Sequence, residues 1–424
     1  MKLTSKLTKT LASLLLAGTI LLPGVAAAQT TLSFVSWQKG EKGYGDWWDL
    51  LIKEFEATHP DVKIDFTLVP RDGYSDAMIT QFAAGAPPDI VHLTSFEYQT
   101  FAENGWLEDL DPWIEKSGMD LTGWAGQGAC TWDGKTQCIM MLYFGYILAY
   151  NEALLNEAGI AVPTNWDEFL AAARATTIDR DNDGIKDVYG TGVHLATANS
   201  SYTNDVLMYV LSAGGRWTNA EGKVTINTPE VIEGINRWRM LVEEELTPLG
   251  MVGGDTDQLF MEGKVAMRIN GPWINGFVQR AEPGIQENLK FAADPLSPPL
   301  GGSSNVLTLA SETPAEKQEL AWEFIQLATS QKFQELYSEL GASPAPKPGA
   351  VSEAAFKAVP HMQLLIDASA AASAAGVDRI PTGLEAQNNE FTKMAAEELQ
   401  RMLIEKLPTE DVVAVIQQKA EALQ

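Results

Sequence analysis

The sequence is poor in cysteine, histidine and basic side chains, and each shortage excludes a class of protein. Two cysteines in 424 residues are too few for a disulfide-stapled scaffold or a cysteine-rich zinc site. The four histidines stand far apart, without the close pairing typical of a histidine metal site. With 30 Lys and Arg against 56 Asp and Glu, the net charge of −26 repels nucleic-acid phosphates and anionic lipid surfaces. We therefore expect no nucleic-acid partner.

Long apolar runs are also scarce, and the one near the start of the chain has the features of a secretory signal peptide. Three lysines form a basic start, and the apolar stretch over 11–25 contains a Pro-Gly pair near its end. Three alanines at 26–28 then suit a signal peptidase. We interpret 1–28 as a cleaved signal peptide, with a membrane anchor as the alternative, and expect export to a bacterial periplasm. No other segment reaches the ~18 apolar residues of a membrane helix, so we expect no membrane insertion.

The two cysteines are spaced so that they can pair in an oxidising compartment. Cys130 and Cys138 flank the turn-like segment 132–135, and a hairpin there would bring the two sulfur atoms within bonding range. The alternative is two small buried apolar side chains. In both cases we expect a structural role.

The remaining composition is that of a globular protein with two domains, or with one unusually large domain. The residues are 45% apolar, and the chain exceeds the ~250–300 residues at which a single core stops growing. β-rich runs at 32–37, 62–68 and 89–93 alternate with helical spacing at 48–55 and 74–84. This order predicts an α/β domain with a largely parallel sheet.

A second α/β region follows. Strands are expected at 146–150 and 265–269, and a loop at 295–302. Helices are expected at 152–158, from 165, at 206–213, 231–245, 315–327 and 332–340, and near the C-terminus. The proline-rich segment 343–349 indicates another boundary.

Motifs for catalysis are missing from the sequence. It contains no G-x-S-x-G elbow, no P-loop and no H-E-x-x-H. A carboxylate pair like that of a glycosidase can always be drawn among 56 acids, so such a pair has no specificity. We expect a binding protein and no enzyme, with a secreted carbohydrate-active enzyme as the alternative.

Aromatic residues at the ends of expected strands indicate a ligand site. Ligands of α/β sheets bind outside the carboxyl ends of strands, and ligands of two-domain proteins bind between the domains. An aromatic ring packs on the apolar face of a pyranose, while neighbouring polar side chains bond its hydroxyls. For any single aromatic, packing in the core is the alternative. The candidates are Trp37, Tyr44, Phe144, Tyr146, Tyr202 and Trp273.

Four segments together resemble the extracellular solute-binding proteins of carbohydrate ABC importers, which include the maltose-binding proteins. They read WQKGEKGY at 37–44, GAPPDI at 85–90, LAYN at 148–151 and FMEGKVAMRINGPW at 260–273. The resemblance covers nearly the whole chain after residue 28. It implies two α/β lobes, joined by strands that cross between them, with the ligand in a cleft that closes by a hinge.

The resemblance also implies that both domains are discontinuous. Crossings are expected near 141–145, 302–306 and 341–347. One lobe then comprises 29–143 plus 305–343, and the other comprises 144–304 plus 344–424.

The resemblance assigns roles to individual residues. Trp273, in the Gly-Pro-Trp motif, corresponds to the residue that stacks on the sugar. The loop after the first strand, which supplies polar contacts in the family, corresponds to Lys39, Glu41 and Lys42. The family's loop after the third strand corresponds to Thr94, Ser95, Phe96 and Glu97. Maltose-binding proteins carry an Asp-Arg pair where this chain has Phe96-Glu97, and an acidic contact where it has Phe144, which puts maltose itself in doubt. Trp37, Tyr44, Tyr146, Tyr202, Asn204 and Ser303 complete the candidate set.

The implied partners are a small-molecule sugar or oligosaccharide and the membrane permease subunits of an ABC importer. The protein itself is expected to be a monomer. The same fold could bind another solute instead. A polyamine would use cleft acids such as Glu41 and Glu97, and an anion would need arginines or helix N-termini.

Residues 179–187 form a candidate calcium loop with the pattern D-x-D-x-D-G-x-x-D. Carboxylates at alternate positions around a tight glycine turn can converge on Ca²⁺, together with a backbone carbonyl. The alternative is a solvated acidic turn. We expect no required cofactor, and a structural Ca²⁺ remote from the sugar is the candidate ion. Its ligands would be Asp179, Asp181, Asp183, Asp187 and the carbonyl of Ile185.

Overall fold

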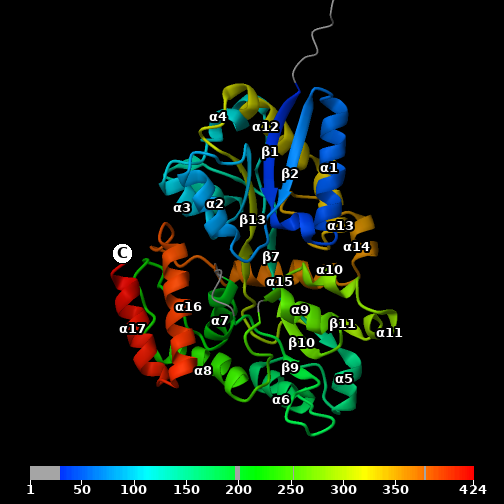
Figure 1. Cartoon of the computed structure of the whole chain (residues 1–424), viewed down its shortest axis with the longest axis vertical. Helices are drawn as coiled ribbons and strands as arrows, with labels where there is room; N and C mark the ends of the chain where they lie inside the picture. Colours follow the sequence, from blue (N-terminus) through cyan, green and yellow to red (C-terminus); the bar gives the residue numbers. More distant parts are fainter. Residues whose placement is uncertain (1–28, 196–200, 252, 377–378) are drawn as a thin grey trace, which may run out of the picture.

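The computed structural model of the chain describes residues 29–195, 201–251, 253–376 and 379–424. These residues form two lobes, one above the other in Figure 1, each built on its own sheet. The signal peptide expected at 1–28 lies outside the described residues. Among the helices of the described part, none is long and apolar enough to cross a membrane.

The first lobe is built on a five-stranded mixed sheet with the order β2-β1-β3-β13-β6. Its strands are β1 (Thr30–Ser36), β2 (Val62–Leu68), β3 (Ile90–Thr94), β6 (Ile139–Met140) and β13 (Asn305–Leu309). The first three are parallel, as expected, but β13 is antiparallel to both β3 and β6. The sheet is therefore less parallel than the sequence predicted, because β13 enters it from the other lobe.

Helices cover this first sheet and supply its core. The 3₁₀-helix η1 (Trp37–Gly40) follows β1 directly. On α1, Trp47, Trp48 and Leu51 are fully buried at helical spacing, and all five residues of β3 are buried, as in a strand covered on both faces. The helices are α1 (Tyr44–Thr58), α2 (Tyr74–Ala83), α3 (Tyr98–Glu103), α4 (Asp111–Ser117), α12 (Ala315–Ala328) and α13 (Gln331–Leu340).

The two cysteines of the first lobe form a buried disulfide. Cys130 and Cys138 are joined by a bond of 2.07 Å between their sulfur atoms. The bridge closes the hairpin of β4 (Thr131–Trp132) and β5 (Lys135–Thr136), which follows the short helix η2 (Gln127–Cys130).

The second lobe is built on a four-stranded sheet with the order β11-β8-β10-β9. The central β10 is antiparallel to β8 and parallel to β9. The expected helix at 206–213 begins earlier, at Ser201. The strands are β8 (Ile147–Asn151), β9 (Tyr189–Thr191), β10 (Val265–Asn270) and β11 (Leu289–Ala293). The helices are α5 (Glu152–Glu157), α6 (Trp166–Thr176), α7 (Ser201–Ser212), α8 (Pro229–Glu243), α9 (Gly253–Met261), α10 (Ile274–Val278), α11 (Pro283–Gln286), α16 (Asn388–Glu405) and α17 (Thr409–Glu421).

Two strands connect the lobes as an antiparallel ribbon. β7 (Tyr143–Gly145) pairs with β12 (Gly301–Ser303) at the two places where crossings are expected. The third crossing between the lobes lies later in the chain than the expected 341–347. Ala345 and Lys347 still bond Ser338 and Thr329, which belong to the first lobe. The chain then forms α14 (Glu353–Ala358), and α15 (Met362–Ala374) lies between the lobes (Figure 1).

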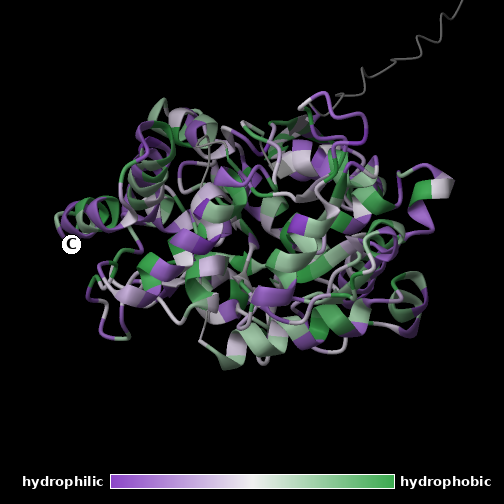
Figure 2. Cartoon of the chain, turned by 90° about the horizontal axis from the view of Figure 1, so that it is seen from below, coloured by the Kyte–Doolittle hydropathy of each residue, from purple (hydrophilic) through white to green (hydrophobic). Residues whose placement is uncertain are grey.

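Seen from below, the outer helices show hydrophilic stretches while hydrophobic residues gather inside (Figure 2). The largest hydrophobic cluster contains buried residues of both lobes, including Trp48 of α1 and Trp238 of α8. Because both lobes have packed interiors, a ligand is expected to bind between them.

Candidate functional site

A cavity of about 220 Å³ lies between the two lobes. Its wall includes residues at the carboxyl ends of strands: Trp37 follows β1, Thr94 ends β3 and Asn270 ends β10. The full lining is Trp37, Gln38, Glu41, Arg71, Asp72, Thr94, Phe96, Tyr146, His194, Asn204, Asp205, Gly254, Asp257, Arg268, Asn270, Trp273, Phe277, Ser304, Asn305 and Arg379.

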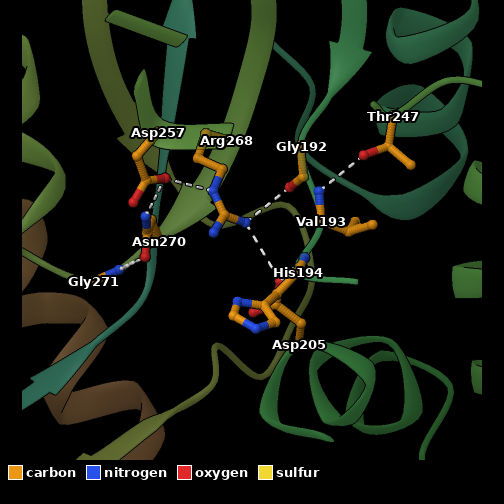
Figure 3. Close-up of polar contacts among 9 residues, drawn as sticks. All are labelled: Gly192, Val193, His194, Asp205, Thr247, Asp257, Arg268, Asn270 and Gly271. Atoms are coloured by element: carbon orange, nitrogen blue, oxygen red, sulfur yellow. Dashed lines mark hydrogen bonds and ion pairs between the residues drawn. The ribbon is translucent and has the colours of Figure 1, made fainter. Parts of the chain in front are cut away.

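The second lobe contributes a buried network centred on Arg268, which points from β10 (Figure 3). Arg268 Nε donates to Asp257 Oδ1 at 2.8 Å, and Nη1 donates to the Gly192 carbonyl at 2.8 Å and to Asp205 Oδ2 at 3.4 Å. Asn270 Nδ2 also donates to Asp257 Oδ1, at 2.8 Å. Burial raises the pKa of Asp257, although Arg268 opposes the shift. The network fixes two carboxylates at the cavity wall.

Each of these carboxylates keeps one oxygen available to a ligand. Asp257 uses only Oδ1 in the network, and Asp205 uses only Oδ2, which also accepts the His194 N–H at 2.7 Å. Within the described part of the chain, neither Asp257 Oδ2 nor Asp205 Oδ1 has a hydrogen-bond partner. A carboxylate oxygen is an acceptor only, so both atoms suit the hydroxyl donors of a sugar.

The first lobe contributes Arg71, which is held in place by Glu97. Arg71 Nη2 donates to Glu97 Oε1 at 2.9 Å, and Thr94 Oγ1 donates to Glu97 Oε2 at 2.6 Å. The guanidinium of Arg71 lies 5.3 Å from the ring centre of Trp37, within the range of a cation–π contact. Burial raises the pKa of Glu41 to about 7, with Arg71 opposing and Asp257 adding to the shift. The carboxyl of Glu41 therefore titrates near neutral pH.

Trp273 is held by aromatic neighbours and by its own turn. Its ring meets Phe144 and Tyr146 edge to face, with centroids 5.0 Å and 6.0 Å away. The indole folds back over Gly271, where a Cβ would lie 2.4 Å from the ring, so a side chain at 271 would displace it. Trp273 is only partly buried and lines the cavity, as a stacking residue must.

The structure places seven of the expected ligand residues in the cavity wall. They are Trp37, Glu41, Thr94, Phe96, Tyr146, Asn204 and Trp273. Trp37 lines it with limited surface, because one face of its ring stacks on His92 at 4.3 Å between centroids. The side chain of Ser303 lies outside the described residues, while the neighbouring Ser304 lines the cavity.

Two tyrosines expected at the ligand are core residues. Tyr44 is buried against Tyr337 and donates to Ser343 Oγ at 3.2 Å. Tyr202 is fully buried and packs edge to face on Trp238. The predictions for these two were wrong because both side chains are buried in the hydrophobic core and do not line the cavity.

Other residues that were expected to contact the ligand bond groups outside the cavity or are buried outside its lining. Lys39 Nζ donates to the Phe66 carbonyl, and Lys42 pairs with Asp46 on α1. Ser95 and Phe144 are fully buried outside the cavity lining, and Glu97 acts through Arg71. Five residues of the cavity lining were not predicted from the sequence: Arg71, Asp205, Asp257, Arg268 and Arg379. For Arg268 a signal was available, since a charged residue inside the apolar strand 265–269 needs a buried partner.

The candidate calcium loop brings three carboxylates together. Oxygen atoms of Asp179, Asp181 and Asp187 lie within 4.8 Å of one another. Asp183 Oδ1 instead accepts the N–H of Ile185, at 2.7 Å. Backbone N–H groups of the loop also donate to Asp179 and Asp187, at 3.0 Å and 2.7 Å. Calcium binding here stays a prediction.

Two sheet-based lobes with a cavity between them define a ligand-binding receptor of the periplasmic-binding-protein fold. The chain belongs to the bacterial extracellular solute-binding protein family, whose pattern matches residues 39–335.

Similar proteins include sugar binders. A binding protein of Brucella abortus (strain 2308) is 28% identical over 60% of this chain, and the match spans 61% of that relative. The diacetylchitobiose-binding protein of Streptomyces coelicolor is 24% identical over 68% of this chain and 67% of its own length.

Solved structures share the whole fold. An ABC-transporter solute-binding protein of Thermotoga lettingae with bound α-D-tagatose aligns with a TM-score of 0.79 and 21% identity, over 93% of this chain and 99% of its own. Maltose-bound MalE3 of Thermotoga maritima aligns with a TM-score of 0.77 and 21% identity, over 94% of this chain and 100% of its own.

Proposed function

We propose that the protein is a receptor that binds a sugar between its two lobes and presents it to the permease of an ABC importer. The observation that carries the proposal is that Trp273 and the Arg268-bound carboxylates of Asp205 and Asp257 line one cavity. A sugar has an apolar face for an aromatic ring and a rim of hydroxyls for fixed polar groups. Few other small solutes have both.

Support for the location and the partner comes from the family, whose members are extracellular solute-binding proteins. We propose that this protein is a monomer in the periplasm. Its membrane partner would be the permease subunits of the importer. The sugar-binding relatives and the tagatose-bound structure favour a carbohydrate over a polyamine or an anion. The abundance of cleft carboxylates also disfavours an anion, because Glu41, Asp72, Asp205 and Asp257 all lie in the cavity wall.

A thermal-shift screen tests the proposal. Monosaccharides, oligosaccharides and sugar alcohols are each added at millimolar concentration, with spermidine and citrate as probes of the alternative solutes. A bound ligand at 100 times its Kd adds about 2.7 kcal/mol of stability, which raises the melting temperature measurably. We expect a sugar or sugar alcohol to give the largest rise. A rise with spermidine or citrate alone would contradict a carbohydrate receptor.

We further propose that the protein releases its ligand unchanged. The ligand found by the screen is incubated with the protein for a day, and the mixture is then separated by chromatography. Recovery of the intact sugar is the expected result, and hydrolysis products that increase with protein concentration would favour an enzyme.

For the acidic loop at 179–187 we propose a structural Ca²⁺. Chelator should lower the melting temperature of protein that contains calcium by elemental analysis, and added Ca²⁺ should restore it. Carboxylates around a tight turn supply oxygen ligands of the kind that Ca²⁺ prefers. Asp181→Ala removes one of these carboxylates and should abolish the effect of chelator and of Ca²⁺ on the melting temperature. The matched control is Asp167→Ala, on the same lobe outside the loop. Calcium-free protein that millimolar Ca²⁺ does not stabilise would end the proposal.

A further inference from the structure

We infer that the cleft takes a single sugar unit, a monosaccharide or a linear sugar alcohol, in preference to an oligosaccharide. This inference rests on the proposed function and adds the size of the ligand. Three features carry it: the volume of the cavity, the contacts between the lobes on either side of it, and the polar groups of its wall.

The cavity is small for a ligand site. Its volume of about 220 Å³ lies below the ~300–1,000 Å³ typical of pockets for drug-sized ligands. A cavity below that range favours a ligand smaller than a drug-sized molecule, such as a single sugar unit, over a chain of several rings.

On one side of the cavity, the lobes bond each other directly. Asn388 Nδ2, at the start of α16, donates to the carbonyl of Phe96 in the first lobe. Asn389 Nδ2 donates to Thr100 Oγ1 of α3 at 3.1 Å, and Thr100 Oγ1 donates to the Ala386 carbonyl at 3.3 Å. Arg379 lies over the Phe96 ring at 4.3 Å and is itself buried. These contacts close the cleft beside Phe96.

On the other side, α10 of the second lobe meets the start of α1. A Cβ at Gly276 would lie 3.0 Å from the carbonyl oxygen of Lys42, so the two backbones are nearly in contact. Figure 1 places α10 below α1 on the right and α16 below α3 on the left. The cavity lies between them, because Phe277 of α10 and Phe96 both line it. The lobe–lobe contacts at Phe96 and at Gly276 therefore limit the length of a ligand that fits between them.

Both lobes contribute polar groups to the wall. Glu41 and Arg71 face the cavity from the first lobe, and Asn204, Asp205 and Asp257 face it from the second. Polar groups on both sides favour a ligand that carries hydroxyls along its whole length, as a free monosaccharide or an alditol does.

Calorimetry over length series tests the inference. The probes are D-glucose, maltose and maltotriose; N-acetyl-D-glucosamine and its disaccharide; D-tagatose; and the alditols ribitol and D-mannitol. We expect the best-binding monosaccharide or alditol to bind at least tenfold more tightly than every di- or trisaccharide in the set. A disaccharide or trisaccharide as the tightest ligand would overturn the inference and leave the proposed function standing. Binding by none of the probes would contradict the proposed function itself.

A matched pair of variants locates the binding. Asp257→Asn removes an acceptor charge at the cavity wall, and Asp255→Asn changes an exposed carboxylate on the same helix α9. We expect the first to weaken binding of the best single-unit ligand at least tenfold and the second to leave it within twofold. Unchanged affinity in Asp257→Asn would show that the small ligand binds elsewhere, and the inference from this cavity would fail.

Discussion

Replacing Trp273 with alanine is expected to weaken ligand binding by about 2–4 kcal/mol, the range of an anchoring hot spot. Phe144 and Tyr146 support the indole edge to face, so its orientation is set before the ligand arrives. A ring fixed in this way offers apolar area to a sugar at little entropic cost. The measurement is calorimetry with the best ligand from the screen.

The control for this variant is Trp132→Ala, in the disulfide-closed hairpin away from the cleft. Denaturant unfolding of the ligand-free Trp273→Ala protein separates binding from packing. A core tryptophan costs about 3–5 kcal/mol of stability when truncated. Unaltered affinity, or a loss of that size in the empty protein, would show that Trp273 packs the fold and does not bind the ligand.

Replacing Arg268 with methionine is expected to destabilise the empty protein by about 3–5 kcal/mol. The change removes the cation between Asp205 and Asp257, which are each about 4% or less exposed, and leaves both carboxylates buried without a counter-charge. The loss is measured by denaturant unfolding in the absence of ligand.

The matched control is Arg174→Met, which breaks the exposed ion pair with Glu244 on the same lobe. Exposed pairs contribute about 0–1 kcal/mol, so this variant should unfold near the wild-type midpoint. If both variants lost the same small amount, the network around Arg268 would not hold the cavity wall in place.

Much of the fold could be predicted from the sequence because its pattern is local. The apolar and alternating runs at 32–37, 62–68 and 89–93 correspond to β1, β2 and β3 within about two residues. The direction of β13 could not be predicted, since its partners β3 and β6 lie far away in the sequence.

The candidate site could be predicted only in part. Trp273 was found through its Gly-Pro-Trp motif, but Tyr44 and Tyr202 have the same chemistry and lie in the core. Whether an aromatic faces a cleft or a core depends on which segments pack against it, and a single sequence does not contain that information. Arg71 and Asp257 were missed for the same reason, since they meet the cavity from opposite lobes.

The central claim is that a sugar binds between the lobes and holds them together. Small-angle X-ray scattering tests it most directly, with and without the best ligand, at concentrations where calorimetry shows saturation. A ligand that contacts both lobes shifts the population toward arrangements in which the lobes contact each other, as Asn388 and Asn389 contact the first lobe here. We predict a smaller radius of gyration with ligand and recovery of the larger value after dialysis. An unchanged radius of gyration in the saturated protein would contradict the account.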